Sequence, residues 1–443
     1  MRTADMIGKD TSESGFVKWC IGLLIMSVAI SPRIPLPLFI PGRTFDLRIE
    51  DILISLLLAA SVFIYFANGR KGIQLTPIGI PIGIYLTIVI LTTLISTGVE
   101  QGNSLRILLY IMKEVEFFAL ALLIANWVNN FRDLEWVGKF ILIGGGLNVG
   151  WAVVQVLTAH YGSLIDIPIP EEAFRLPESR KVFWHGVCSI GERSPFSVAG
   201  FFALISFLSY AFFFFGDGTS RWNRFFLVLG MAFSACSVLT GAKIAFAFFM
   251  IGFITMVAIT TRDRRKITKS LLLIAVAAVV LVGIPRLLAD RAPGVSTHLF
   301  QINMYKIDND RLHRWKQMIP YGIEHSLTGI GKGNQLYIKE DGEYVEEAHN
   351  HYIKVFVESG IFGLAAFLFL LGAIAYHCID LLKKASHTIS RVMAGATLSA
   401  LFGLSVAAVV QDAFKPVLPN EIFWIFVGLS MAALRMEKET GPE

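Results

Sequence analysis

Long apolar runs, separated by short polar stretches, cover most of the chain. The first run begins at Phe16 and the last ends at Leu434. Each run is close to the roughly 20 residues that a helix needs to cross about 30 Å of hydrocarbon. The alternative is a large helical soluble enzyme, but the runs are too many and too long to form one buried core. The pattern therefore predicts an all-α polytopic membrane protein.

About twelve transmembrane helices are predicted from these runs. The stretch from Phe225 to Thr261 is divided by one charge only, Lys243. A single helix there, rising about 1.5 Å per residue, would be about 55 Å long and would overshoot the membrane. Two helices that turn at Thr240-Gly241 are therefore expected. The predicted spans are Phe16–Ile30, Asp51–Ala67, Ile78–Ser96, Ile107–Trp127, Trp136–Thr158, Phe196–Phe215, Phe225–Thr240, Ala242–Thr261, Ser270–Leu287, Phe356–Cys378, Val392–Val410 and Ile422–Leu434.

Positive charge in the short loops orients these helices. Lysine and arginine gather in alternate loops, at 70–71, 132, 221–224, 262–266 and 383–391. Short cytoplasmic loops attract these residues, so both termini are predicted to be cytoplasmic. Three longer polar segments then face outward: 31–50, 160–195 and 287–355. We expect one transmembrane domain over residues 1–443, with 287–355 as a partly helical insert before the tenth span.

Composition excludes several other classes of protein. Hydrophobic residues make up 54% of the chain and charged residues 16%, whereas soluble domains carry about a quarter charged residues. The net charge of +5 is spread over short loops without a basic block, so no nucleic-acid partner is predicted. Four cysteines without a CxxC pair argue against a disulfide framework, a structural zinc site and a redox pair. The first apolar run lacks a small-x-small cleavage pattern and is expected to be a retained helix.

Charged residues in unusual places are the first candidates for chemistry. Lys113, Glu114 and Glu116 lie within the fourth span, where charges are expensive and often functional. Lys113 and Glu116 are three residues apart on a helix and can also simply pair. The outward segments are rich in arginine, which suits phosphate recognition, although solvation or pairing with nearby acids is an open alternative. These arginines are Arg33, Arg43, Arg48, Arg175, Arg180, Arg193, Arg291, Arg311 and Arg314.

The insert is expected to contain a short amphipathic helix. Asp310 is a plausible N-cap for a helix that begins at Arg311 and breaks at Pro320. Such a helix would rest on the membrane surface and present Arg311 and Arg314 beside it. The apolar face of this helix would consist of Leu312, Trp315 and Ile319. Beyond it, the cluster from Gly329 to Asn334 follows no strand, so a tight turn that approaches another group is favoured over a nucleotide-binding loop.

His349 lies at the outer mouth of the tenth span. On a continuous helix, Tyr352, Phe356, Gly360 and Gly363 would fall on nearly the same face as His349. Two glycines three residues apart allow another helix to pack closely. An imidazole has an unperturbed pKa of about 6.5 and is suited to accept a proton at neutral pH. A surface histidine at a helix entrance is the structural alternative.

Taken in order, these residues resemble the motifs of a known family. His349-Asn350, nine residues and then Gly360-Ile361-Phe362-Gly363 match the His-Asn-x9-Gly-x-x-Gly pattern of the O-antigen ligase family, which is related to the O-antigen polymerases. Arg311-x3-Trp315 and Gly329-x-Gly331-x-Gly333-Asn334 resemble the preceding Arg-x3-Trp and Gly-x-Gly region. One position departs from the pattern, because Lys243 stands where the family often has arginine. Lysine keeps the charge but loses the bidentate fork.

The resemblance implies a glycosyltransferase of the GT-C kind in the bacterial inner membrane, with its site and the 287–355 insert in the periplasm. Its donor would be a glycan on undecaprenyl diphosphate and its acceptor a lipid A-core sugar hydroxyl. His349 would act as general base, while Arg311, with Lys243 and Arg193, would neutralise the departing diphosphate. Arg314 and Asn350 are further candidate substrate-binding residues. Membrane lipids are the remaining predicted partners, and neither a metal nor another cofactor is expected.

Two other functions stay open. A polymerase of O-antigen, capsule or exopolysaccharide would use the same lipid-linked donor but another glycan as acceptor. A polysaccharide transporter would do no chemistry, and it would be expected to contain broken helices and ionisable groups near the membrane midplane.

Overall fold

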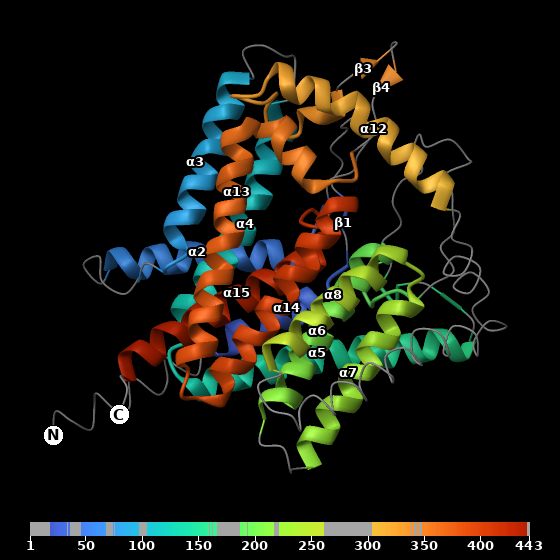
Figure 1. The fold of residues 1–443 in the computed structure, drawn as a ribbon. Helices are drawn as coiled ribbons and strands as arrows, with labels where there is room; N and C mark the ends of the chain where they lie inside the picture. Colours follow the sequence, from blue (N-terminus) through green and yellow to red (C-terminus); the bar gives the residue numbers. More distant parts are fainter. Residues whose placement is uncertain are drawn as a thin grey trace.

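The computed structural model of the protein is an assembly of helices (Figure 1). It describes residues 18–32, 34–35, 46–67, 74, 76–96, 104–158, 160–161, 163–165, 187–192, 194–216, 221–260, 304–337, 339–340, 343–344 and 348–440. The helices are Lys18–Ile30, α2 (Ile49–Ala67), α3 (Gly79–Ser96), α4 (Ser104–Trp127), α5 (Phe131–Thr158), α6 (Pro195–Phe215), α7 (Arg221–Leu239), α8 (Lys243–Thr260), α12 (Met304–Glu324), α13 (His351–Lys384), α14 (Thr388–Val410) and α15 (Val417–Thr440).

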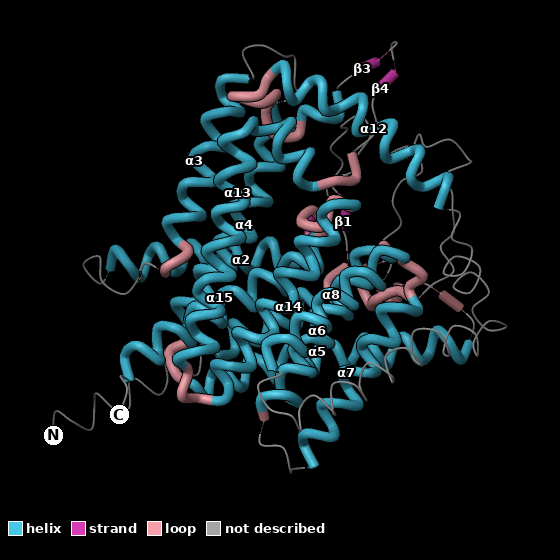
Figure 2. Tube along the Cα trace, in the orientation of Figure 1, coloured by secondary structure: helices cyan, strands magenta, loops and turns pink. Residues whose placement is uncertain are grey.

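Strands contribute very little to the described part of the chain (Figure 2). β1 (Ile34–Pro35) pairs with β2 (Asp46–Leu47), and β3 (Lys339–Glu340) pairs with β4 (Glu343–Tyr344). Both pairs are antiparallel and two residues long. A 3₁₀ turn, η4 (Asn334–Tyr337), begins at the end of the glycine cluster. The predicted all-α architecture is therefore confirmed for these residues.

Eight of the described helices are long and apolar enough to cross a membrane: α2, α3, α5, α6, α7, α13, α14 and α15. Shorter or more charged helices cover three other predicted spans, at Lys18–Ile30, α4 and α8. The predicted span Ser270–Leu287 lies outside the described residues, so the count of twelve stays a prediction. The predicted turn after the seventh span is present, because Gly241 takes a left-handed φ of 76° between α7 and α8. Together the apolar helices indicate a multi-pass membrane protein.

The helices differ in how far they are buried by their neighbours. Within the 18-residue apolar stretch of each helix, 94% of the stretch is buried inside the protein in α15 and 89% in α6. In α2 the buried share is 18%. α6 packs against α7, α8, α14 and α15, which places it at the centre of the bundle. α2 exposes a row of large apolar side chains, as expected for a helix with lipid on most of its surface.

Loops predicted to share a side of the membrane also share an end of the bundle. On the predicted inner side, Arg435 near the C-terminus donates to the carbonyl of Val128 at 2.8 Å. On the predicted outer side, Arg48 and Glu192 form an ion pair at 2.5 Å, although they are 144 residues apart. The alternation of ends is therefore consistent with the predicted topology. Which end faces the periplasm stays a prediction.

The helix of the insert differs from its prediction in both of its ends. α12 begins at Met304, so Asp310 lies inside the helix and does not cap it. It also continues through Pro320 to Glu324, where a break was predicted. Proline removes the bond to the carbonyl four residues earlier, here Lys316. Because Pro320 and Lys316 are both exposed, water can satisfy that carbonyl and the helix survives.

Candidate functional site

The candidate site is organised by a break in α13. Gly360 has φ 66° and ψ −168°, which separates a first segment, 351–359, from a second segment, 361–384. Only glycine adopts such a backbone without strain. A Cβ at this position would also lie 2.5 Å from the carbonyl oxygen of Leu327. α13 is therefore two helices, and the chain changes direction between them (Figure 1).

The glycine cluster and the turn before it, which contains Ser326, cap the two halves of this broken helix. The amides of Ile330 and Gly331 donate to the carbonyls of Val357 and Glu358, each at 2.9 Å. In return the amide of Ile361 donates to the carbonyl of Ser326 at 2.7 Å. These are the orphan groups that a helix end normally leaves without partners. The sequence predicted a tight turn here that approaches another group. In the structure that group is the broken backbone of α13.

Three glycines determine the backbone conformation of the loop 326–333, which is here termed the capping loop. Gly329, Gly331 and Gly333 have φ angles of 65°, 88° and 74°, in the region that disfavours side chains. The amide of Gly333 donates to a carboxylate oxygen of Glu358 at 2.9 Å. Gly360 therefore contacts a loop backbone, whereas the sequence pattern suggested close contact with another helix. The spacing Gly-x-Gly-x-Gly is explained by capping and not by a phosphate ligand.

A buried lysine fastens the capping loop to α3 and α4. Lys332 is 3% exposed, and its ammonium pairs with Glu114 and, at 3.3 Å, with Glu358. Burial alone would lower the pKa of Lys332, but the carboxylates, Glu114 first, hold it well above its usual value, so the lysine stays charged. Ser96 at the end of α3 adds a hydrogen bond to the carbonyl of Gly329 at 2.9 Å. The loop is thus anchored to helices that are distant in sequence.

His349 precedes α13 and has a strained backbone. Its φ of 49° makes it the non-glycine residue with positive φ in the described part of the chain. On one side, the Trp315 indole N–H donates to the carbonyl of Ala348 at 2.7 Å. On the other, the Asn350 side chain caps α13 by accepting from the amide of Ile353 at 3.0 Å. Strain held by flanking anchors is characteristic of functional positions.

The predicted helical face through His349 is therefore wrong. α13 begins two residues after His349 and breaks at Gly360, so no continuous helix aligns His349 with Gly360 and Gly363. Asn350, expected to bind substrate, uses its side-chain oxygen to cap the helix. Gly363 lies beside Ser359, the last residue before the break, and so belongs to the same bend.

A buried charged network lies next to His349 and was not predicted from the sequence. Asp412, in the α14–α15 loop, accepts from His351 Nδ1 with one oxygen and from Lys354 Nζ at 2.7 Å with the other. Burial would raise the pKa of Asp412, but Lys354 and then His351 hold it well below its usual value. The network fastens the first turn of α13 to the end of α14. His351 and Asp412 are 61 residues apart, and no local motif links them.

The predicted arginines are only partly within the described residues. Arg311 and Arg314 are half-buried on α12. Arg311 lies four residues before Trp315 and therefore shares its face of the helix, the face that contacts Ala348. Arg193 and the side chain of Lys243 lie outside the described residues. The backbone nearby is described, and the amide of Val187 donates to the carbonyl of Leu239 at 3.0 Å, so the two loops that carry these residues touch.

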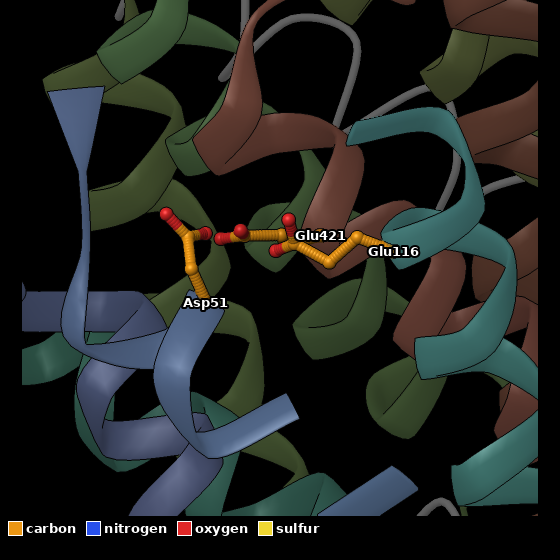
Figure 3. A group of neighbouring side chains, drawn as sticks. All are labelled: Asp51, Glu116 and Glu421. Carbon is orange, nitrogen blue, oxygen red and sulfur yellow. The ribbon is translucent and has the colours of Figure 1, made fainter. Parts of the chain in front are cut away.

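A second group of charges, here termed the buried ionic cluster, joins α2, α4, α15 and the 187–194 loop. It contains two cations and five carboxyl groups: Arg48, Lys113, Glu50, Asp51, Glu116, Glu192 and Glu421. Figure 3 shows the carboxylates of Asp51, Glu116 and Glu421 converging on one point. The predicted pairing of Lys113 with Glu116 is present, at 2.9 Å.

The three converging carboxylates could hold a metal ion by composition, but an ammonium group already lies among them. Lys113 Nζ is 2.5 Å from Asp51, 2.9 Å from Glu116 and 3.6 Å from Glu421. These distances place the lysine charge where a metal would have to bind. The donor set therefore fits a resident ammonium better than a metal ion. On the loop side of the cluster, burial would lower the pKa of Arg48, but Glu192 and Glu50 raise it, so this guanidinium stays charged.

Comparison with known proteins supports the resemblance seen in the motifs. Residues 225–368, about a third of the chain, match the family model described as O-antigen ligase. The matched part contains most of α7, all of α8 and α12, the capping loop, His349 and the break in α13. Asp412 and the buried ionic cluster lie outside it. No curated protein matches the chain.

Proposed function

We propose that this membrane protein of the O-antigen ligase family transfers a glycan from undecaprenyl diphosphate to a sugar hydroxyl of the lipid A core, at the periplasmic face of the inner membrane. The family match supports the broad activity. The observation that carries the finer proposal is the hydrogen bond from Trp315 to the carbonyl of Ala348. It ties the helix of Arg311 to the residue before His349, so a cation and a base are held on neighbouring backbone.

His349 is the proposed general base. Its imidazole takes the proton of the acceptor hydroxyl while the hydroxyl oxygen forms a bond to the anomeric carbon. The bond between that carbon and the diphosphate oxygen breaks, and the electron pair leaves with the lipid diphosphate. A positioned base contributes roughly 10²–10⁴-fold to such a step. The anchored, left-handed backbone of His349 supports this role because it fixes where the side chain begins.

Cations are proposed to stabilise the leaving lipid diphosphate. Arg311 and Arg314 on α12 supply guanidinium groups, whose forks suit phosphate oxygens. Arg193 and Lys243 are proposed to add charge from the two loops that meet at Val187 and Leu239. Fixed cations in a site shielded from water can provide the charge stabilisation that Mg²⁺ gives elsewhere. We therefore expect transfer without a metal ion.

A direct test uses purified protein in vesicles with lipid-linked glycan, lipid A-core acceptor and EDTA. Transfer is expected to continue in EDTA, and loss that Mg²⁺ restores would refute the metal-free mechanism. His349→Ala should lower transfer at least about 100-fold, in line with removal of a base. His313→Ala is the matched control, because His313 is an exposed histidine on α12. Equal activity of His349→Ala and wild type, both folded, would remove the base assignment.

The polymerase alternative uses the same donor and differs in its acceptor. Supplying either lipid A-core or a second lipid-linked glycan to the same vesicles separates the two activities. In cells, loss of a ligase leaves long polymer on the carrier lipid and bare core. Loss of a polymerase leaves core with a single repeat, or no exopolysaccharide. Transfer to lipid-linked glycan alone would replace the ligase proposal with the polymerase.

The transporter alternative finds some support in the broken α13, but the geometry weakens it. In transporters, broken helices leave backbone groups available to bind substrate or ions. Here the carbonyls of Val357 and Glu358 and the amide of Ile361 are bonded to the protein's own capping loop. The break is thus a closed structural joint and offers these groups to no ligand.

A further inference from the structure

α12 exposes a stripe of large apolar side chains. Leu312, Ile319 and Ile323 are 48%, 37% and 64% exposed, and Leu327 in the following turn is 63% exposed. Their spacing of seven, four and four residues keeps them within about 80° of one another at about 100° per residue. Trp315, expected on the same face, is instead turned toward Ala348. The exposed stripe, within which Lys316 also lies, is therefore distinct from the packed face.

A different face of α12 is packed firmly on the protein. Met318 is fully buried in a small cluster with Ile330, Ala348 and Val357. Gly322 lies so close to α13 that a Cβ there would be 2.6 Å from the Phe356 ring. Because this face holds the helix in place, the stripe cannot turn inward to hide from water.

The stripe continues into the apolar surface of a candidate membrane span. The amide of Ile361 bonds the carbonyl of Ser326 at 2.7 Å, which brings Leu327 next to the start of the second segment of α13. There Ile361 and Phe362 are 45% and 57% exposed. That segment belongs to one of the helices apolar enough to cross a membrane. Exposed apolar side chains are thus present on both sides of the junction between the turn after α12 and a candidate membrane span.

The charges of α12 exclude a membrane-spanning position. Over 21 residues it carries Lys306, Asp308, Asp310, Arg311, Arg314, Lys316 and Glu324. In Figure 1 the C-terminal end of α12 lies at the top of α3, α4 and α13, and the rest of the helix slants away from them to the right. A helix with one apolar stripe and a charged remainder binds in the plane of the membrane interface. Lys316 is exposed within the stripe, and its long side chain can carry the ammonium group outward to lipid phosphates.

We propose that α12 is an interfacial helix, and that Leu312, Ile319, Ile323 and Leu327 contact the acyl chains of the leaflet next to the capping loop. The packed face then holds Trp315 against Ala348 while the stripe fixes the helix at the level of the lipid headgroups. Arg311 and Arg314 accordingly lie at the depth of lipid phosphates. The contact with lipid stands whether or not the protein transfers a glycan.

Spin labels on the full-length protein in phospholipid vesicles test this placement. Single nitroxides are introduced by Leu312→Cys, Ile319→Cys and Ile323→Cys. His313→Cys and Gln317→Cys are controls on the polar flank of α12, about 80° and 120° from the centre of the stripe at about 100° per residue. The unsubstituted protein gives the background from its own cysteines, three of which are buried. Accessibility is measured to oxygen, which concentrates in acyl chains, and to a water-soluble nickel complex.

At the stripe we expect an oxygen-to-nickel ratio several-fold higher than at His313 and Gln317. Equal ratios at stripe and control positions would place the stripe in water and overturn the proposal. Immobile labels inaccessible to both reagents would indicate a second copy or another protein on the stripe, and would overturn it equally. Because glycan transfer is not measured, failure here leaves the proposed function intact, and failure of transfer leaves this placement intact.

Discussion

The α13 break and the buried ionic cluster are both held together by contacts between distant segments, yet only one is marked by a sequence motif. At the break, backbone geometry requires glycine at Gly360 and along 329–333, so the need is written as residue type and spacing. In the ionic cluster, Arg48 and Glu192 need only meet as opposite charges. A required backbone conformation fixes the residue type and the spacing, so it produces a recognisable motif. An ion pair requires only two opposite charges, so its residues cannot be distinguished in the sequence from other charged residues.

The largest effect is expected from the ionic cluster. Arg48→Ala leaves Glu192 and Glu50 without their buried cation, and breaking such a pair costs about 3–5 kcal/mol. We expect a much lower thermal unfolding temperature in detergent. Arg224→Ala, at an exposed arginine, is the control and should change little. An unchanged stability of Arg48→Ala would mean that the cluster is open to water.

A somewhat smaller effect is expected for Asp412→Asn, because the asparagine keeps a side-chain oxygen that can accept one of the two hydrogen bonds. Asp412→Asn leaves the buried Lys354 unpaired, which should cost up to about 3–5 kcal/mol and reduce transfer. The lowered pKa of Asp412 means that its stabilisation is present above the unfolded pKa of about 3.9 and is lost as pH falls through the lower folded value.

The difference in unfolding free energy between wild type and Asp412→Asn should therefore persist from about pH 5 to 8, because the Asp412 carboxylate stays ionised over that range. It should shrink only below about pH 4, toward the folded pKa. Unfolding curves of both proteins across this range check the sign. A difference that disappears as pH rises from 5 to 8 would contradict the assigned ionisation.

At the break, Gly360→Ala tests the backbone requirement directly. The left-handed φ and the nearby Leu327 oxygen should cost about 1–3 kcal/mol or more. The capping loop should loosen, seen as faster amide exchange at Ile330 and Gly331. Gly372→Ala is a matched control in the same helix, since a Cβ there meets open space and alanine favours a helix by about 1 kcal/mol. Equal behaviour of the two variants would remove the special role of Gly360.

The smallest effect is expected for Trp315→Phe, which tests whether the hydrogen bond from Trp315 to Ala348 positions His349. It removes one hydrogen bond to Ala348 and keeps most of the ring, at a cost of about 1 kcal/mol. We expect kcat to fall with little change in KM, because the base is misplaced while the donor still binds. Trp222→Phe, at an exposed tryptophan, should leave both constants unchanged. A change in KM alone would assign Trp315 to substrate binding.

The helices could be predicted because the membrane imposes a length on each apolar run. The turn at Gly241 and the ends of α3 and α14 agree with the predictions within a few residues. The α13 break was not foreseen, because apolar periodicity does not report a single residue with positive φ. The span of α12 was mispredicted for a related reason, since exposure of Pro320 and Lys316 is a tertiary property that local rules for proline do not contain.

For the candidate site, too, some residues could be singled out from the sequence and others could not. His349 and Arg311 were singled out through motif spacing, and the Trp315 bond holds the two motifs next to each other. Their roles in catalysis stay predictions. Asp412 was missed because it meets His351 only after α13 and α14 pack. The three charges of the fourth span were noticed, but their partners Asp51, Glu421 and Lys332 lie on three other segments. Charge pairs of this kind become visible only in three dimensions.

The hydrogen bonds between the capping loop and the break in α13 determine which segments must be exchanged together when chimeras are made with related proteins. Residues 326–333 and 357–361 satisfy each other's backbone groups, so neither can be transplanted alone without leaving amides or carbonyls unbonded. A chimera that carries both stretches from one parent should fold, whereas one that joins them from parents with a different loop length should not. The two stretches therefore form one structural unit, and a change of length in one requires a compensating change in the other.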